Sequence, residues 1–268
     1  MILNEIFNHK KTTNLIGLDN EFILLKNLLN KNKMPKILLL SGRKGIGKST
    51  LINHLLHYYY DKNNYDEKNL TIINKSLFNN QFINNLYPNI IYLDGSEYKN
   101  ISIEEIRNLK NILLKSSFNT DKRFIILNNI EAFNISCVNA LLKILEEPGK
   151  TNYFILINNQ TKSIIETVKS RCLEIKILLT DNSRIKIILY LMKNFSQDIT
   201  LDYNLLKIST GNYLKFNYIF NEKKIDIEDD FIVNLAKLLK IFKKEKNLFF
   251  KDFIKFYAEY YFQKKKSK

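Results

Sequence analysis

Residues 42–49, Gly-Arg-Lys-Gly-Ile-Gly-Lys-Ser, have the types and spacing of a loop that binds phosphate. The glycines let the backbone curl so that its N–H groups point at phosphate oxygens at the start of a helix. The lysine would reach the β- and γ-phosphates of a nucleotide, and the serine would bind Mg²⁺. A loop kept only for its turn would preserve the same glycines, so both interpretations stay open. The sequence thus predicts a nucleotide site formed by Gly42, Gly45, Gly47, Lys48, Ser49 and Thr50.

Hydrolysis at such a loop also requires an acidic residue at the end of a buried strand, to hold the metal and orient water. The candidate strand, Phe124–Leu127, runs into Asn128 and Asn129, whose side chains are neutral and cannot act as a general base. Glu131 is the nearest acid, but it lies beyond the strand end and is a poor substitute. We therefore expect ATP to be bound, if at all, without hydrolysis, and Mg²⁺ to bind only together with the nucleotide.

The composition limits the other classes of function. The formal net charge of +15 fits a surface for nucleic acid or an acidic partner, or a compositional preference for Lys, Asn and Ile; the spread of the lysines does not separate the two. The two cysteines, Cys137 and Cys172, are far apart, which excludes a four-cysteine zinc site within the chain and fits a reducing cytosol. His54 and His57 lack a further ligand nearby, so we expect no metal site there and no zinc. No apolar stretch approaches the roughly 18 residues that a membrane helix needs, and we expect a cytoplasmic protein with no membrane partner.

Short apolar runs alternate with helical patterns in the first two thirds of the chain. A parallel α/β sheet covered on both faces is the expected fold. Ser102 and Glu105 form a capping box that opens a helix through Leu113. Residues 61–88 are polar and Asn-rich, and we expect a loop-rich insertion there. The predicted strands are Lys36–Leu40, Ile90–Leu93, Phe124–Leu127, Tyr153–Ile157 and Glu174–Leu178.

After Thr180 the pattern predicts only helices. An acidic stretch over 226–230 interrupts them and marks a plausible boundary. The expected helical segments are Arg184–Asn194, Leu201–Ser209, one that starts near Asn212, and the aromatic-rich stretch Phe231–Phe262.

Three segments in this order resemble the clamp-loader branch of the AAA+ ATPases: Asn14-Leu-Ile-Gly17 before the P-loop, the helix Asn139–Pro148 ending in Leu-Glu-Glu-Pro, and Ser170-Arg171-Cys172. The resemblance covers roughly residues 14–180. It implies a P-loop AAA+ parallel-sheet domain over 1–178, a small helical lid over 179–225, and a reduced or partial helical collar over 226–268.

Within this branch the chain is most similar to the delta-prime subunits of bacterial DNA polymerase III. Gamma/tau subunits have an Asp-Glu pair where Asn128 and Asn129 stand here. Zinc cysteines occur in gamma/tau and in many delta-prime subunits, so their absence from residues 61–88 departs from both patterns. The resemblance implies that Arg171 acts in trans on ATP bound by a neighbouring subunit. It also matches Asn158, or its neighbour Asn159, to a position that contacts the γ-phosphate, and Lys215 to a lid position usually held by arginine.

The partners implied by the resemblance are the gamma/tau and delta subunits, the sliding clamp and the backbone of primed DNA. Two alternatives remain: a gamma/tau-like subunit or another AAA+ protein that hydrolyses ATP itself, and a non-catalytic DNA-binding adaptor that would depend on the lysines and not on Arg171.

Overall fold

The computed structural model describes residues 8–73, 76–95, 101–115, 117–118, 121–196, 198–203, 208–223, 225, 229–245 and 249–267. The chain divides into two compact units, Met1–Leu178 and Leu179–Lys268. In the described residues of the first unit a parallel sheet lies between helices, whereas those of the second unit form helices only.

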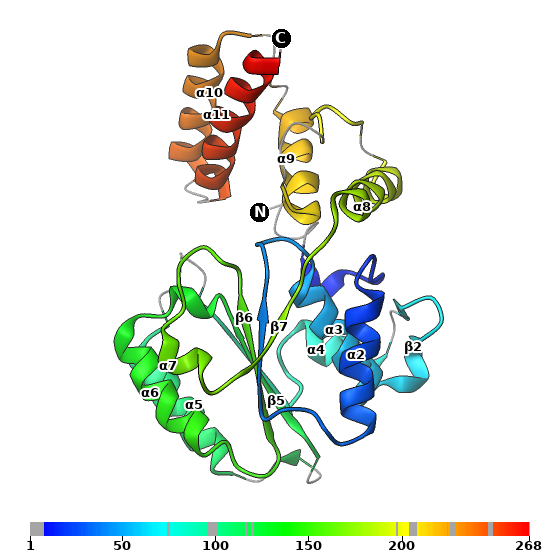
Figure 1. Cartoon of the computed structure of the whole chain (residues 1–268), viewed down its shortest axis with the longest axis vertical. Coiled ribbons are helices and arrows are strands. Elements are labelled where there is room, and N and C mark those ends of the chain that lie inside the picture. Colours follow the sequence, from blue (N-terminus) through cyan, green and yellow to red (C-terminus); the bar gives the residue numbers. More distant parts are fainter. Residues whose placement is uncertain are drawn as a thin grey trace. The chain divides into compact units, whose positions relative to one another are not determined.

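A five-stranded sheet with the order β4-β5-β6-β1-β7 organises the first unit, and every neighbouring pair is parallel. All residues of β1 and β5 are buried, because helices cover both faces of the sheet (Figure 1). The predicted parallel α/β fold is confirmed, and each predicted strand coincides with an observed one to within two residues at either end. The strands are β1 Ile37–Ser41, β4 Ile90–Asp94, β5 Arg123–Asn128, β6 Asn152–Asn158 and β7 Leu173–Lys176.

Helices α2, α3 and α4 lie on one face of this sheet, and α5, α6 and α7 lie on the other (Figure 1). The predicted capping box opens α5, because the Ser102 hydroxyl accepts from Glu105 N at 3.2 Å and the Glu105 carboxylate accepts from Ser102 N at 2.9 Å. The helices are α2 Asp19–Asn30, α3 Lys48–Tyr60, α4 Leu77–Ile83, α5 Ile103–Leu113, α6 Ile135–Glu146 and α7 Glu166–Lys169, with single 3₁₀ turns η1 His9–Lys11, η2 Lys62–Asn64 and η4 Ile130–Ala132.

The expectation of a loop-rich insertion over residues 61–88 was only partly right. An antiparallel ribbon, β2 Tyr65–Asp66 with β3 Thr71–Ile72, and the helix α4 lie within this segment. Ser76 caps α4 by accepting from Asn79 N at 3.0 Å. Phe78 and Phe82, four residues apart, both place their rings 5.0 Å from the ring of His57. Aromatic packing therefore orders a segment whose polar composition conceals a helix.

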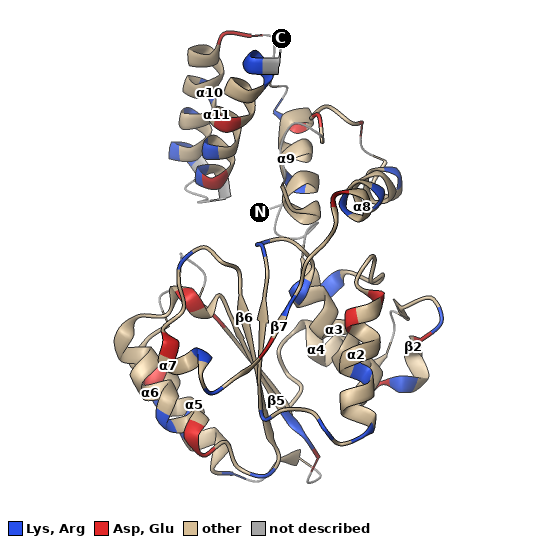
Figure 2. Cartoon of the chain, in the orientation of Figure 1, with Lys and Arg blue, Asp and Glu red and all other residues tan. Residues whose placement is uncertain are grey.

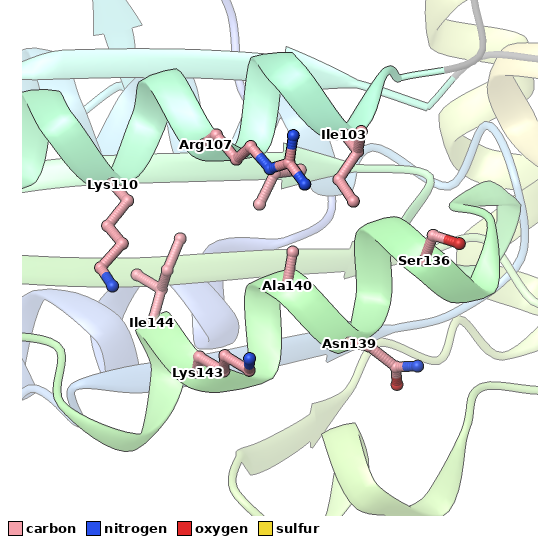
Figure 3. Close-up of a pocket in the computed structure, with 9 residues that line it drawn as sticks. Ile103, Arg107, Lys110, Ser136, Asn139, Ala140, Lys143 and Ile144 are labelled. Atoms are coloured by element: carbon pink, nitrogen blue, oxygen red, sulfur yellow. The ribbon is translucent and has the colours of Figure 1, made fainter.

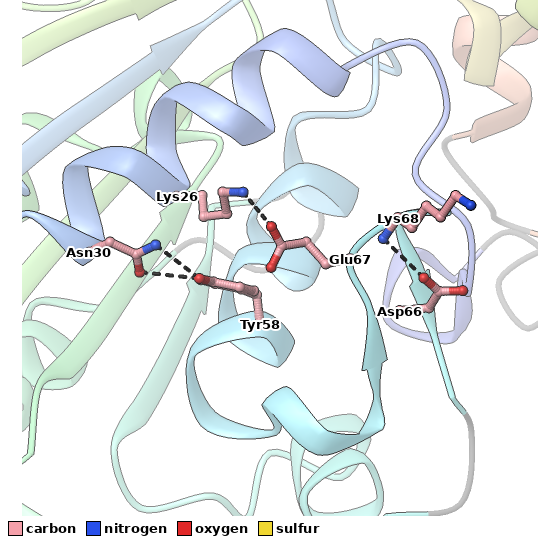
Figure 4. Close-up of polar contacts among 6 residues, drawn as sticks. All are labelled: Lys26, Asn30, Tyr58, Asp66, Glu67 and Lys68. Carbon is pink, nitrogen blue, oxygen red and sulfur yellow. Dashed lines mark hydrogen bonds and ion pairs between the residues drawn. The ribbon is translucent and has the colours of Figure 1, made fainter.

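Polar contacts also fasten the ribbon and α2 to the rest of the unit (Figure 4). Lys26 of α2 pairs with Glu67, and the Asp66 carboxylate accepts from Lys68 N at 3.0 Å in the turn. The amide of Asn30 donates to the Tyr58 hydroxyl at 3.0 Å, which joins the end of α2 to α3. Tyr58 is buried at the end of α3.

The second unit has an aromatic core shared by α9 and α11. Phe216 stacks on Phe256 with ring centroids 4.4 Å apart, and Phe220 meets Phe253 edge to face. Residues 204–207 of the predicted helix over 201–209 lie outside the described residues, and the described ends, 201–203 and 208–209, are not helical. The boundary at 225/226 between lid and collar stays a prediction. The helices are α8 Asp181–Asn194, α9 Thr210–Glu222, α10 Phe231–Glu245 and α11 Phe249–Ser267.

Figure 2 shows lysines and arginines distributed over both units without one dominant block. Within the described residues, no helix has the length and apolarity required to cross a bilayer.

Helix α3 carries two buried histidines. The Nδ1 atom of His54 lies 3.1 Å from the Tyr65 hydroxyl, and His57 contacts Asn53 O and Asn79 Oδ1. Burial, helped by the neighbouring charge of His57, lowers the pKa of His54 to about 3. Both rings therefore act as neutral members of the core at neutral pH.

We predict that His54 contributes to loss of stability in acid. Because its pKa falls from 6.5 in the unfolded chain to about 3 in the fold, the unfolded state binds more protons between these values, and stability decreases as the pH falls through this window. Between pH 6 and 4, His54→Phe should reduce the change of the free energy of unfolding with pH by up to about 1.4 kcal/mol per pH unit. Urea unfolding at a series of pH values measures this slope. Tyr65→Phe loses the same hydrogen bond without a titrating ring and should keep the wild-type slope. An unchanged slope in His54→Phe would refute the assignment.

Candidate functional site

The glycine-rich loop joins the end of β1 to the start of α3. Gly45 and Gly47 have φ angles of 83° and 108°, in the left-handed region that favours glycine. A Cβ atom on Gly42 would lie 2.7 Å from the carbonyl oxygen of Ile177, so this close approach of two chain segments also requires glycine. Gly47 is the N-cap of α3 and supplies no side-chain cap. The first N–H groups of α3 are therefore placed to meet an anion.

Lys48 is turned into the loop itself. Its Nζ atom donates to Gly42 O at 2.6 Å and to Arg43 O at 3.0 Å, and the residue is only 3% exposed. Burial lowers the pKa of Lys48 to about 8, and the charge of Glu131 opposes this shift. A bound phosphate would have to replace the two carbonyl partners of the Lys48 amine. Ser49 and Thr50, the next two residues, lie half-buried in the first turn of α3.

Neutral side chains stand where an ATPase needs an acid. Asn128 is the last residue of β5 and is 9% exposed. The Asn129 amide donates to Asp94 Oδ1 at 2.6 Å, and its carbonyl oxygen accepts from Asn159 Nδ2 at 2.5 Å. Asn129 is thus a link between strand ends, and neither amide can take up a proton from water.

Glu131 lies closer to the loop than its place beyond the strand suggests. The single turn η4 returns it toward the sheet, where it is 8% exposed and acts electrostatically on Lys48. One carboxylate oxygen accepts from Asn159 N and from the Thr161 hydroxyl, both at 3.0 Å. The other is buried and has no hydrogen-bond partner in the described part of the chain. Its contribution to the site is negative charge and loop anchoring, which the sequence alone did not reveal.

Tyr92 of β4 is a second residue that sequence reasoning missed. Its hydroxyl is buried near the side chains of Ser49 and Asn128. Burial raises the pKa of the phenol well above its usual range, and the nearby polar side chains of Ser49 and Asn128 oppose that rise. The space beside Ser49 is therefore lined by a neutral hydroxyl and a neutral amide. Among the described residues, no group of three His, Cys, Asp or Glu side chains could hold a metal ion.

Asn158 and Asn159, the two residues matched to the γ-phosphate position, make different contacts. Asn158 ends β6 opposite Ser41 and donates to the Ser41 hydroxyl at 3.3 Å, beside the start of the glycine-rich loop. Asn159 instead bonds to Asn129 and Glu131. Lys215 is half-buried on α9 in the second unit, and its role as a lid sensor stays a prediction.

The Ser-Arg-Cys segment caps the C-terminus of α7. The Ser170 hydroxyl and Arg171 Nη1 both donate to Thr167 O, at 3.2 Å and 2.8 Å, and the Cys172 thiol lies 3.0 Å from Val168 O. The Ser170 and Arg171 side chains thus satisfy the Thr167 carbonyl near the helix end, and the Cys172 thiol adds a contact to the Val168 carbonyl, which also accepts from Arg171 N at 3.2 Å. The motif therefore has a structural reason for each of its three residues.

The Arg171 side chain is accessible, with 34% of its surface exposed. Its Nη2 lies 2.7 Å from Glu146 Oε1 at the end of α6. A guanidinium has five N–H donors, and these two contacts use two of them. Arg171 precedes β7, so it lies at the amino-terminal edge of the sheet, whereas the glycine-rich loop lies at the carboxyl edge.

With this geometry in view, the comparisons with known proteins decide the family. A family model described as DNA polymerase III, delta subunit, matches residues 18–180, which is more than half of the chain. The chain belongs to this family. The resemblance to the clamp-loader branch of the AAA+ proteins is confirmed.

Relatives of this family include both kinds of subunit considered above. The chain is 36% identical over 81 residues to the delta' subunit of DNA polymerase III from Buchnera aphidicola subsp. Baizongia pistaciae, which covers 30% of this chain and 24% of that protein. It is 28% identical over 196 residues to the gamma subunit from Buchnera aphidicola subsp. Acyrthosiphon pisum, covering 73% and 53%. The chain thus spans about a quarter of the first relative's length and about half of the second's. A solved gamma subunit-related protein from Thermotoga maritima has a TM-score of 0.48 at 17% identity, covering 85% of this chain and 75% of that one.

We predict that this member of the DNA polymerase III delta subunit family does not hydrolyse ATP by itself. The neutral side chains of Asn128 and Tyr92 supply no base, and Lys48 is engaged by carbonyls. Steady-state turnover of Mg·ATP by the purified chain should equal that of Lys48→Ala, within the background of the assay. Turnover that Lys48→Ala abolishes would contradict this prediction and favour a self-hydrolysing subunit.

Proposed function

We propose that the chain is a delta-prime-like subunit of the bacterial DNA polymerase III clamp loader. It would sit beside a gamma/tau subunit and supply Arg171 to the ATP site of that neighbour. It would also act as a fixed member of the complex, with the delta subunit, while the sliding clamp is placed on primed DNA.

The position of Arg171 relative to the chain's own loop carries this proposal. Strands β1 and β7 pair from Leu38–Leu173 to Ser41–Lys176, three residue steps that span about 10 Å. Arg171 lies beyond one end of this paired stretch, and Gly42 lies beyond the other. The distance between them is too long for an arginine side chain to span. A phosphate bound by this guanidinium would therefore belong to another molecule. The planar fork of guanidinium donors suits that ligand.

The chain's own loop supports a non-hydrolytic role. A nucleotide here would place its phosphates on the N–H groups at the start of α3 and on Lys48, with Mg²⁺ reaching the site only through Ser49 and the phosphates. ATP would provide binding energy at this loop, and Asn158 would offer an amide beside it. Asn128 holds the place of the missing acid, so the residues fit phosphate binding better than cleavage.

Substitution of Arg171 tests the trans role. Arg171→Ala should leave folding intact and reduce the DNA-stimulated ATPase of a complex reconstituted with gamma/tau, delta and the sliding clamp. An arginine finger contributes roughly 10³–10⁵ in rate at the site it serves. Because only one neighbouring site is served, the activity of the whole complex should fall several-fold.

Two matched variants sharpen this measurement. Lys169→Ala removes a nearby exposed cation and should have no effect, whereas Arg171→Lys keeps the charge but loses the fork and should resemble Arg171→Ala. Undiminished ATPase in Arg171→Ala would sink the proposed role.

A gamma/tau-like subunit that hydrolyses ATP is the second candidate, and the longer match to a gamma subunit favours it. The absence of an acid at Asn128 opposes it. Turnover by the purified chain separates the two, as described for Lys48→Ala.

A basic groove between α5 and α6 supports contact with the DNA backbone. Figure 3 shows Arg107 and Lys110 reaching from α5 and Lys143 projecting from α6 around an apolar floor that includes Ala140 and Ile144. The carboxylate of Glu104 lies 3.9 Å from Arg107, but both side chains are about two thirds exposed, so this pair is weak. Three exposed cations over a groove suit a chain of phosphates, read by charge and not by base edges.

Neutralising this groove should weaken DNA binding and its dependence on salt. In the reconstituted complex, the triple variant Arg107→Ala, Lys110→Ala, Lys143→Ala should reduce the slope of log K against log salt by about 0.9 for each lost phosphate contact. Fluorescence anisotropy with primed DNA at several salt concentrations measures it. The control is a triple variant that removes the same charge from the side of the sheet covered by α2: Lys31→Ala, Lys33→Ala, Lys68→Ala. It should keep the wild-type slope. Equal slopes for the two triple variants would contradict a specific role for the groove.

A further inference from the structure

We infer that Glu146 is a positioning residue for Arg171, an inference that rests on the proposed trans role of that arginine. Glu146 closes the helix of the Leu-Glu-Glu-Pro segment, 25 positions before the arginine. The 2.7 Å contact between Glu146 Oε1 and Arg171 Nη2 joins the two sequence motifs by which the chain resembles its family. Glu146 thus holds one terminal nitrogen of the guanidinium from the end of a packed helix.

The guanidinium is held from two sides by different atoms. Nη1 donates to the Thr167 carbonyl oxygen at 2.8 Å, and Nη2 bonds to Glu146 at 2.7 Å. Two anchors on the two terminal nitrogens fix the plane of the group. In the described part of the chain the remaining three donors meet no acceptor, so a phosphate could be bound without breaking either anchor.

Both anchors rest on packed elements. Leu145, next to Glu146, and Val168, next to Thr167, belong to the same hydrophobic core cluster and are at most 2% exposed. The ends of α6 and α7 are thereby held together. The distance between the Glu146 backbone and the Thr167 carbonyl is therefore set by the core.

The placement of Glu146 breaks a local rule for helices. The C-terminal end of a helix is the negative end of its dipole and disfavours an acid, yet Glu146 and Glu147 end α6 one after the other. Arg171 offsets this charge at Glu146, whereas no ion pair involves Glu147 among the described residues. A locally unfavourable residue with a specific partner indicates a role for the pair beyond the stability of the helix.

Pre-orientation has a measurable kinetic consequence. Immobilising a long side chain at the moment of reaction costs about 0.5–1.5 kcal/mol, which corresponds to roughly a two- to tenfold change in rate. Glu146→Gln should therefore lower kcat of the DNA-stimulated ATPase by about two- to tenfold, less than Arg171→Ala does. The KM for ATP should not change, because the nucleotide is bound by the neighbour.

The test compares four variants in the complex reconstituted with gamma/tau, delta, the sliding clamp and primed DNA. Glu147→Gln is the matched control, since it removes the same charge one residue away, and it should leave kcat and KM unchanged. The double variant Glu146→Gln, Arg171→Ala should equal Arg171→Ala, because a positioning residue has no effect once its partner is absent.

The possible failures are distinguishable. If Arg171→Ala lowers kcat but Glu146→Gln does not, the positioning role is overturned and the proposed function stands. If Glu146→Gln lowers kcat equally with and without Arg171, its effect is structural and the inference also fails. If Arg171→Ala has no effect, the proposed trans role falls and takes the inference with it.

Discussion

The parallel pairing of β1 with its two neighbours is the constraint on which the other features of the first unit depend. It brings the ends of β1 and β6 together at one edge, so that Ser41 faces Asn158 and the glycine-rich loop begins beside them. It places the end of β5, with Asn128, one strand further along the same edge. The same pairing with β7 puts Arg171 at the opposite edge. One sheet thus separates the glycine-rich loop from the Arg171 side chain and keeps them at opposite edges.

With Asn128 and Asn129 in place of an acid at the end of β5, the polar groups around the glycine-rich loop pair within the chain. A carboxylate buried there without metal would be costly, whereas an amide can both donate and accept, as Asn129 does toward the Asp94 carboxylate and the Asn159 amide. Lys48 also satisfies its charge locally, through the carbonyls of Gly42 and Arg43. The glycine-rich loop is therefore stable as a fold element with no ligand, and its glycines are needed for the chain path in either case.

The parts of the fold that could be predicted from sequence are those set by local pattern. Apolar runs bounded by glycine, proline or polar residues located every strand of the sheet, and the capping box at Ser102 located the start of α5. Helix α4 was not predicted because it is only seven residues long, and its buried rings, Phe78 and Phe82, contact residues distant in sequence, among them His57 of α3 and Lys10 of η1. Contacts between residues that are far apart in the sequence leave no local pattern from which they could be predicted. The approach of Tyr92 to Ser49, and of Glu131 to Lys48, depends on strand register and on one turn of 3₁₀ helix.

The Ser-Arg-Cys segment completes the end of α7 and leaves donors of its arginine unused. A four-residue helix is too short to be stable alone, and here its last carbonyls are capped by the side chains that follow it. Capping uses one end of the arginine, and the ion pair with Glu146 uses another. The remaining donors are presented on a side chain whose conformational freedom the fold has already reduced. Since ordering a long side chain opposes binding, an arginine that is ordered before its partner arrives is a better phosphate ligand than the same residue on a free loop.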